Sequence, residues 1–252
     1  MSRGFSAAAA CGGLVLLLGG APASAVPISL GFDSGGLSAG NITGSEAAFT
    51  DAGVSIALKN AGTNSLALFD STCRFQFNAT TYNSGEDACT GGDPDLGTAA
   101  ELGTGPQDLV LIANEGTDAD PDDFAGTYEF EYTFSAPDGV LIEQIEMLDL
   151  DGAEDIAFSA LFLGEDPADG PVTLTEASVD LVGTPTTDNS LRRYTFDDTR
   201  AVEVFYIEFK GTSGAVGSLE FTPRVVPVPA ALPLMLGGLG LLGMIGLRRR
   251  RS

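Results

Sequence analysis

The chain has 252 residues, of which 35 are acidic and 12 basic, and it contains neither histidine nor tryptophan. Its net charge of −23 excludes nucleic acid as a partner, since like charges repel. The lack of histidine excludes Ser-His-Asp and Cys-His nucleophilic catalysis and the usual general base at neutral pH.

The N-terminus has the three parts of a secretory signal peptide. Arg3 provides the positive charge, residues 7–18 form the apolar run, and Ala23-Ser24-Ala25 places small residues at the −3 and −1 positions. We therefore expect residues 1–25 to direct export and to be removed before Val26.

The exported domain then covers residues 26–225, long enough for one well-buried core. All 35 acidic residues lie in it, and removing Arg3 and the four C-terminal arginines leaves 7 of the 12 basic residues. The domain therefore carries a charge of 7 minus 35, or −28. Such a surface attracts cations and repels anionic membranes. The simpler interpretation of this charge is that it keeps the protein soluble in a salty medium. The more specific alternative is that the carboxylates bind a divalent cation.

Short apolar or alternating segments separated by turn residues follow one another through this domain, with no convincing helix. The predicted strands cover residues 26–32, 54–58, 66–69, 108–113, 127–134, 140–150, 156–163, 171–182, 194–196, 201–209 and 215–221. Ten or eleven short strands with frequent turns predict an all-β fold, a jelly-roll-like β-sandwich.

The segment 127–134 alternates strictly, which puts four aromatic residues on one face and two glutamates on the other. The aromatic residues are Tyr128, Phe130, Tyr132 and Phe134. We interpret this face as core, with a sugar-binding surface as the alternative. The apolar phase of the next strand slips near Glu143-Gln144, which predicts a β-bulge. Residues 201–209 are apolar on both faces around Phe205, which predicts a central strand.

Two cysteines, Cys73 and Cys89, remain after processing, because Cys11 lies in the signal peptide. In an exported protein such a pair predicts a disulfide. It closes a short loop and contributes about 3 kcal/mol in the chain-entropy model. Zinc is disfavoured, because two cysteines without histidine supply too few soft ligands.

Aspartates gather in three turn regions, and carboxylates on loops suit calcium, a hard cation that takes oxygen ligands. The candidate calcium ligands are Asp93 and Asp95, then Asp118, Asp120, Asp122 and Asp123, then Asp149 and Asp151. The third region begins like an EF-hand loop, but Ala160 occupies its position 12, and we reject that motif. The alternative for all three regions is solvated turns, which Asp, Gly and Pro favour on backbone grounds.

The C-terminal residues 226–252 hold a proline-rich motif, an apolar segment and a basic cluster. The motif is Val226-Pro227-Val228-Pro229-Ala230, the apolar segment runs from Leu232 to Leu247, and the cluster is Arg248, Arg249, Arg250 and Arg251. As a helix, the segment would span about 24 Å, against about 30 Å for a hydrocarbon core. It predicts a short transmembrane helix over 232–247 with the arginines on the cytoplasmic side. A permanent tail anchor is one interpretation.

This order of motif, helix and arginine cluster resembles the VPLPA-CTERM variant of the PEP-CTERM sorting signals, with Val228 where the family has leucine. The resemblance implies a Gram-negative bacterium in which an exosortase, a membrane-embedded transpeptidase-like enzyme, removes the tail and passes the protein to the envelope or outside. The middle of the chain also resembles, loosely, a domain often found ahead of such signals. That resemblance rests on Asp93-Pro94-Asp95, Asp120-Pro121-Asp122-Asp123, Asp149-Leu150-Asp151 and Gly211-Thr-Ser-Gly-Ala, and it implies no activity.

The sequence therefore predicts an exported, non-enzymatic protein of the cell envelope or extracellular matrix, tethered to the inner membrane before processing. The first alternative is a calcium-dependent module that binds a ligand such as extracellular polysaccharide. A hydrolase using paired carboxylates is the second, and it needs a carboxylate spacing that sequence does not reveal.

Overall fold

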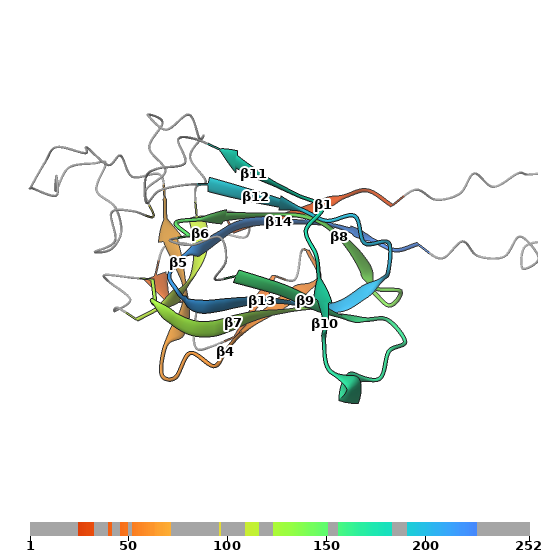
Figure 1. The fold of residues 1–252 in the computed structure, drawn as a ribbon, viewed down its shortest axis with the longest axis horizontal. Helices are drawn as coiled ribbons and strands as arrows, with labels where there is room; N and C mark the ends of the chain where they lie inside the picture. The colour runs from red at the N-terminus through yellow and green to blue at the C-terminus, as the bar shows by residue number, and fades with distance from the viewer. Residues whose placement is uncertain are drawn as a thin grey trace, which may run out of the picture. The chain divides into compact units, whose positions relative to one another are not determined.

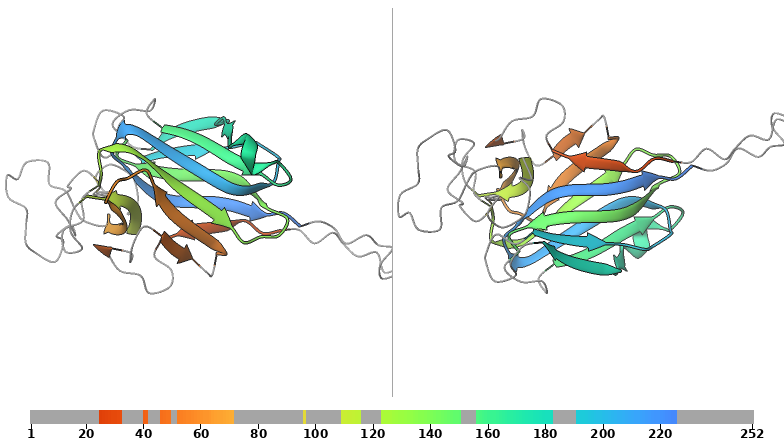
Figure 2. Two further views of the ribbon diagram at one scale, coloured as in Figure 1. Left: turned by 90° about the horizontal axis from the view of Figure 1, so that it is seen from below. Right: turned by 90° about the horizontal axis from the view of Figure 1, so that it is seen from above.

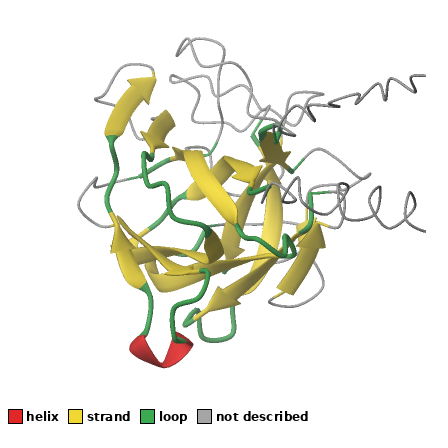
Figure 3. Cartoon of the chain, turned by 90° about the vertical axis from the view of Figure 1, so that its right-hand side faces the viewer, coloured by secondary structure: helices red, strands yellow, loops and turns green. Residues whose placement is uncertain are grey.

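The computed structural model describes residues 25–32, 40–41, 46–49, 52–71, 96, 109–115, 123–150, 156–182 and 191–225, all in one compact unit, Ala25–Val225. The strands are β1 (Ile28–Gly31), β2 (Gly40–Asn41), β3 (Glu46–Phe49), β4 (Val54–Lys59), β5 (Ser65–Asp70), β6 (Leu109–Asn114), β7 (Gly126–Phe134), β8 (Val140–Leu148), β9 (Ile156–Phe162), β10 (Val172–Leu174), β11 (Ser178–Val182), β12 (Leu191–Thr195), β13 (Val202–Thr212) and β14 (Ala215–Pro223). A single turn of 3-10 helix, Pro167–Asp169, lies between β9 and β10 (Figure 3).

The strands form one antiparallel sheet that folds back on itself into two facing layers and nearly closes into a barrel (Figure 1). One layer holds β3, β4, β7, β13, β9 and β10, and the other holds β11, β12, β8 and β14, with β1 and β6 beside β14. Strands β5 and β2 continue from β6. The layers join where Val202 of β13 pairs with Val140 of β8.

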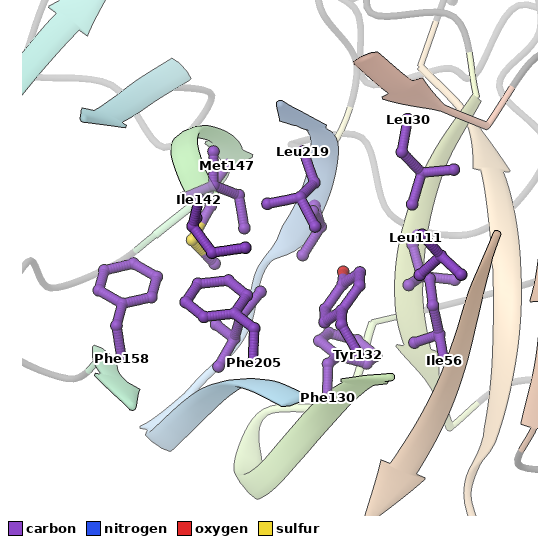
Figure 4. Close-up of a cluster of buried hydrophobic side chains, with 14 of the residues drawn as sticks. Leu30, Ile56, Leu111, Phe130, Tyr132, Ile142, Met147, Phe158, Phe205 and Leu219 are labelled. Carbon is purple, nitrogen blue, oxygen red and sulfur yellow. The ribbon is translucent and has the colours of Figure 1, made fainter. Parts of the chain in front are cut away.

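A continuous hydrophobic core fills the space between the two layers. Figure 4 shows rings from one layer, among them Phe130, Phe158 and Phe205, facing Ile142, Met147 and Leu219 from the other. All of these side chains are at most 3% exposed. The aromatic stripe of β7 belongs to this core, since Tyr128, Phe130 and Tyr132 are fully buried. The prediction of a core face is confirmed, and the sugar-binding alternative for these rings is wrong.

The all-β prediction is confirmed, and two finer predictions about single strands hold as well. Glu220 pairs with Gln144 and Phe221 with Ile142, so Glu143 is the extra residue of a bulge in β8. Strand β13 has β7 on one side and β9 on the other, which makes it central.

Strand boundaries were predicted less well. The segment 171–182 is two strands, β10 and β11, which lie in different layers, and the short strands β2 and β3 were not predicted. Short strands carry too few alternating positions for a pattern to be recognised.

In the part of the chain that the structure describes, no helix is long and apolar enough to cross a membrane. The predicted signal peptide, the two cysteines Cys73 and Cys89, and the sorting signal lie outside the described residues.

Candidate functional site

Buried polar side chains gather at one end of the sandwich, which we call the acidic end. Of the five buried polar or charged residues in the described ranges, four lie there: Asn114, Asp123, Asp149 and Thr212. The fifth, Ser71, follows β5, whose end pairs with the start of β6. Asn114 ends β6, Asp149 follows β8, and Thr212 ends β13. Asp123 precedes β7 and forms an isolated bridge with Asn114. The acidic end thus takes residues from four separate parts of the chain.

Asp123 is held at the acidic end by backbone pairing. Next to its bridge with Asn114, the amide of Phe124 donates to the carbonyl oxygen of Ala113 at 2.7 Å. Asp123 itself is 6% exposed. This aspartate is therefore fixed against the end of β6, unlike a solvated turn residue.

Asp149 adopts a left-handed backbone with φ of 52° and is 2% exposed. Aspartate tolerates this conformation better than most residues. The β13–β14 turn packs directly against it: a Cβ at Gly214 would lie 3.2 Å from the Asp149 carbonyl oxygen and 2.6 Å from a methyl carbon of Leu150. Gly214 is therefore needed for the close approach of these two turns.

Tyr128 is buried at the same end of the sandwich. Its hydroxyl donates to the carbonyl oxygen of Gly214 at 3.3 Å, and its ring stacks on Phe209 with centroids 4.4 Å apart. Burial raises the pKa of Tyr128 well above its usual value, and the negative charges of Asp123 and Asp149 raise it further. The charges of both carboxylates therefore act on one buried hydroxyl.

Arg192 of β12 brings a positive charge to the turn after β8. Its Nη2 atom donates to the carbonyl oxygen of Leu150 at 3.0 Å. Its Nε and Nη1 atoms are buried without a hydrogen-bond partner in the described structure. Arg192 therefore places a positive charge at the turn that carries Asp149, where it offsets part of the negative charge.

A second set of carboxylates lies on the outer face of β7 and β13. Glu208 pairs directly across the strands with Glu129, and Lys59 forms an ion pair with Glu131 at 3.4 Å. The pKa of Glu129 is raised, first by partial burial and then by the charges of Glu208 and Glu131. Like charges directly opposite each other destabilise a sheet.

The structure also has a shallow depression on the surface of β4 and β7. It is lined by Gly53, Val54, Ser55, Thr133, Phe134 and Ser135. None of these six side chains is a carboxylate or a base, so the depression brings no acid–base chemistry of its own.

Of the eight predicted calcium ligands, Asp123 and Asp149 are described, and the structure brings them to the same end of the sandwich. Asp93, Asp95, Asp118, Asp120, Asp122 and Asp151 lie outside the described residues. Within the described ranges, no group of three or more Asp, Glu, Cys or His side chains is arranged to hold a metal ion. Two carboxylates alone leave most of the six to eight oxygen positions of calcium to other donors.

Sequence reasoning did not find Tyr128, Arg192 or Gly214 as parts of this end. Tyr128 was interpreted as core, which it is, but its hydroxyl also donates to Gly214 and its pKa is raised by the charges of both aspartates. The feature of the sequence that could have indicated this end was Gly214, a glycine in the turn between two predicted strands.

No family model, no curated protein and no solved structure matches the chain. The resemblance of residues 226–251 to VPLPA-CTERM signals remains a prediction.

Proposed function

We propose that this protein is an exported, non-enzymatic protein of the cell envelope or extracellular matrix, held at the inner membrane by its C-terminal segment and released or transferred by an exosortase-type enzyme. The domain between its two ends is an acidic β-sandwich with structural or adhesive use. For the two ends of the chain, the partners predicted from the sequence are the export and sorting machinery and the membrane.

One observation carries this proposal: the first and last strands of the domain pair with each other beside both predicted processing points. Strand β1 begins at Ile28, three residues after Ala25, and β14 ends at Pro223, three residues before Val226. Val26 and Val225 are 74% and 43% exposed. Both ends can therefore be cut without removing a residue from the sheet.

The expected products define the test. Mass spectrometry of the protein recovered from the envelope or medium should find an N-terminus at Val26 and a C-terminus that lacks Arg248 to Arg251. An exported protein with an intact arginine cluster contradicts processing and favours a permanent anchor.

Within the all-β class, we infer that the fold is a jelly-roll-like sandwich. Most successive strands alternate between the layers, as in β6 to β7, β7 to β8, β8 to β9, β12 to β13 and β13 to β14. Such layer-crossing connections are typical of double-sheet jelly rolls. A solved structure with a different strand order would contradict this.

A second candidate function is calcium-dependent binding of a ligand such as extracellular polysaccharide. The burial of Asp123 and Asp149 at the same end of the sandwich, where the charges of both raise the pKa of Tyr128, favours it, because a divalent cation would offset the negative charge of buried carboxylates. Asp123 and Asp149 would hold the ion together with further oxygen donors. Calcium there would neutralise the negative charge of the pair.

A calcium titration followed by thermal unfolding tests this second function. Binding should stabilise the protein by about 2.7 kcal/mol at a hundredfold excess over the dissociation constant. The Asp149→Asn variant should lose this response, whereas Asp138→Asn, at the opposite end of the sandwich, should keep it. A flat response of the wild type to calcium excludes the candidate.

A further inference from the structure

Both ends of the described domain lie at one end of the sandwich, which we call the base. Strand β1 runs antiparallel to β14, with Ile28 opposite Phe221 (Figure 2, right). Continuing this register by two residues brings Val26 opposite Pro223. The predicted signal-peptide cleavage point and the start of the sorting motif are therefore neighbours in space.

The turns and strand ends around these two termini complete the base. The amide of Arg224 donates to the carbonyl oxygen of Gly139 at 2.9 Å. The amide of Leu163 donates to the carbonyl oxygen of Ala201 at 2.7 Å. Pro223 pairs with Val140, which follows Gly139. The base thus contains the β7–β8 turn, the end of β9, the start of β13 and the end of β14.

The base and the acidic end are at opposite ends of the sandwich. Strand β8 starts at Val140 in the base and ends at Leu148, next to Asp149. From the first to the last of its nine residues there are eight steps of about 3.3 Å, which separate the two ends by about 26 Å.

The base carries exposed apolar side chains. Val26, Leu163 and Val225 are 74%, 41% and 43% exposed, and they are three of the five exposed large hydrophobic residues in the described ranges. Charged side chains lie at the same end: Arg200 forms ion pairs with Glu165 and Asp198, and Asp138 lies in the β7–β8 turn. The base is therefore mixed, and since the domain as a whole carries −28, a zwitterionic membrane surface suits it better than an anionic one.

The length of chain between the domain and the apolar segment limits the orientations that the tethered domain can adopt relative to the membrane. Seven steps lead from Val225 to Leu232, and Pro227 and Pro229 favour an extended polyproline conformation. At about 3.1 Å per residue this connection spans about 22 Å, less than the length of the sandwich. With the acidic end against the bilayer, the base would be too far away for the tail to reach the hydrocarbon core.

We propose that the base is the membrane-facing surface of the tethered protein and that its occupant is the lipid bilayer. Val26, Leu163 and Val225 face the headgroups, while Asp123 and Asp149 point away from the membrane. This rests on the proposed C-terminal tether, and it adds the orientation in which the domain is presented to other molecules.

The test uses the full chain reconstituted in phosphatidylcholine vesicles that carry a short-range paramagnetic quencher on the headgroup. A fluorescent non-natural amino acid replaces Leu163 at the base in one protein and the exposed Glu115, next to Asn114 at the acidic end, in another. We expect strong quenching of the label at 163 and none at 115 above the level in quencher-free vesicles. Equal quenching at both positions, or stronger quenching at 115, overturns the orientation.

Flotation of the vesicles separates this result from the tether itself. If the full chain does not float with the vesicles, the tether fails, and the orientation fails with it. If it floats and the labels do not differ as expected, the tether stands and the orientation alone is wrong. A flexible Gly-Ser insertion of about 20 residues between Val225 and Val226 should reduce the quenching at 163, because it removes the length restriction.

Discussion

Tyr128 and Tyr132 lie two residues apart on β7, and both are fully buried, but their hydroxyl groups differ. The Tyr128 hydroxyl donates to the carbonyl oxygen of Gly214, whereas the Tyr132 hydroxyl has no hydrogen-bond partner in the described structure. Burial raises the pKa of both, so neither ionises at physiological pH. A buried polar group without a partner costs stability, while one that is paired contributes to it.

This difference predicts opposite outcomes for two matched substitutions. Tyr128→Phe should destabilise the protein by about 1 kcal/mol, and Tyr132→Phe should be neutral or slightly stabilising. Urea unfolding of the two variants measures both effects. A larger loss for Tyr132→Phe than for Tyr128→Phe would show that the partners are wrongly assigned.

Gly214 and Gly211 provide a second matched pair, in one turn. Both have positive φ, at 146° and 79°, but a Cβ at Gly211 meets nothing within 4 Å, whereas one at Gly214 contacts Leu150 and the backbone of Leu148 and Asp149. Gly211→Ala should cost about 1 kcal/mol from backbone strain alone. Gly214→Ala should cost more, about 3 kcal/mol, because backbone atoms must also move.

The comparison is made by denaturant unfolding at one pH. Equal losses for the two alanine variants would mean that the close packing of Gly214 on the β8 turn contributes nothing to stability.

At the scale of single strands, the outer face of β7 and β13 holds a repulsive pair, Glu129 and Glu208. Because the folded protein raises the pKa of Glu129 above its usual 4.5, the ionised form is less stable in the folded state than in the unfolded state. The resulting loss of stability is absent below the unfolded pKa and develops as the pH rises through the folded pKa.

Glu129→Gln should therefore stabilise the protein by a few tenths of a kcal/mol at neutral pH, since the site is partly exposed and solvent screens it. The gain should disappear as the pH falls through the pKa of Glu129. Glu131→Gln is the control: Glu131 pairs with Lys59, so its loss should be neutral or slightly destabilising. Stabilisation by both variants at neutral pH would point to general charge repulsion instead of this pair.

At the scale of the whole molecule, the charge of −28 on residues 26–225 opposes the compact state. Salt screens this repulsion over a Debye length of about 10 Å at 0.1 M. The melting temperature should therefore rise with sodium chloride. Calcium chloride at the same ionic strength should raise it further if Asp123 and Asp149 bind the ion, and equal effects of the two salts would limit calcium to screening.

Strand type could be predicted from the sequence because alternation is local. The stripe from Tyr128 to Phe134, the bulge at Glu143 and the two-sided apolar run around Phe205 each depend on neighbours a few residues away. The split between β10 and β11 was missed, because the turn at residues 175–177 interrupts a segment whose composition still favours strand.

Of the candidate site, the sequence supplied Asp123 and Asp149 as members of two separate acidic clusters. By itself it also determined the all-β class and the acidic composition, and it predicted the two processing points. Only the tertiary structure decided that the two aspartates lie at the same end of the sandwich as the Tyr128 hydroxyl, that Gly214 packs against Asp149, and that β1 pairs with β14. The physical reason is that these contacts come from pairing between strands far apart in the chain. Alternation specifies which face of a strand is buried, but it does not specify which strand lies next to it.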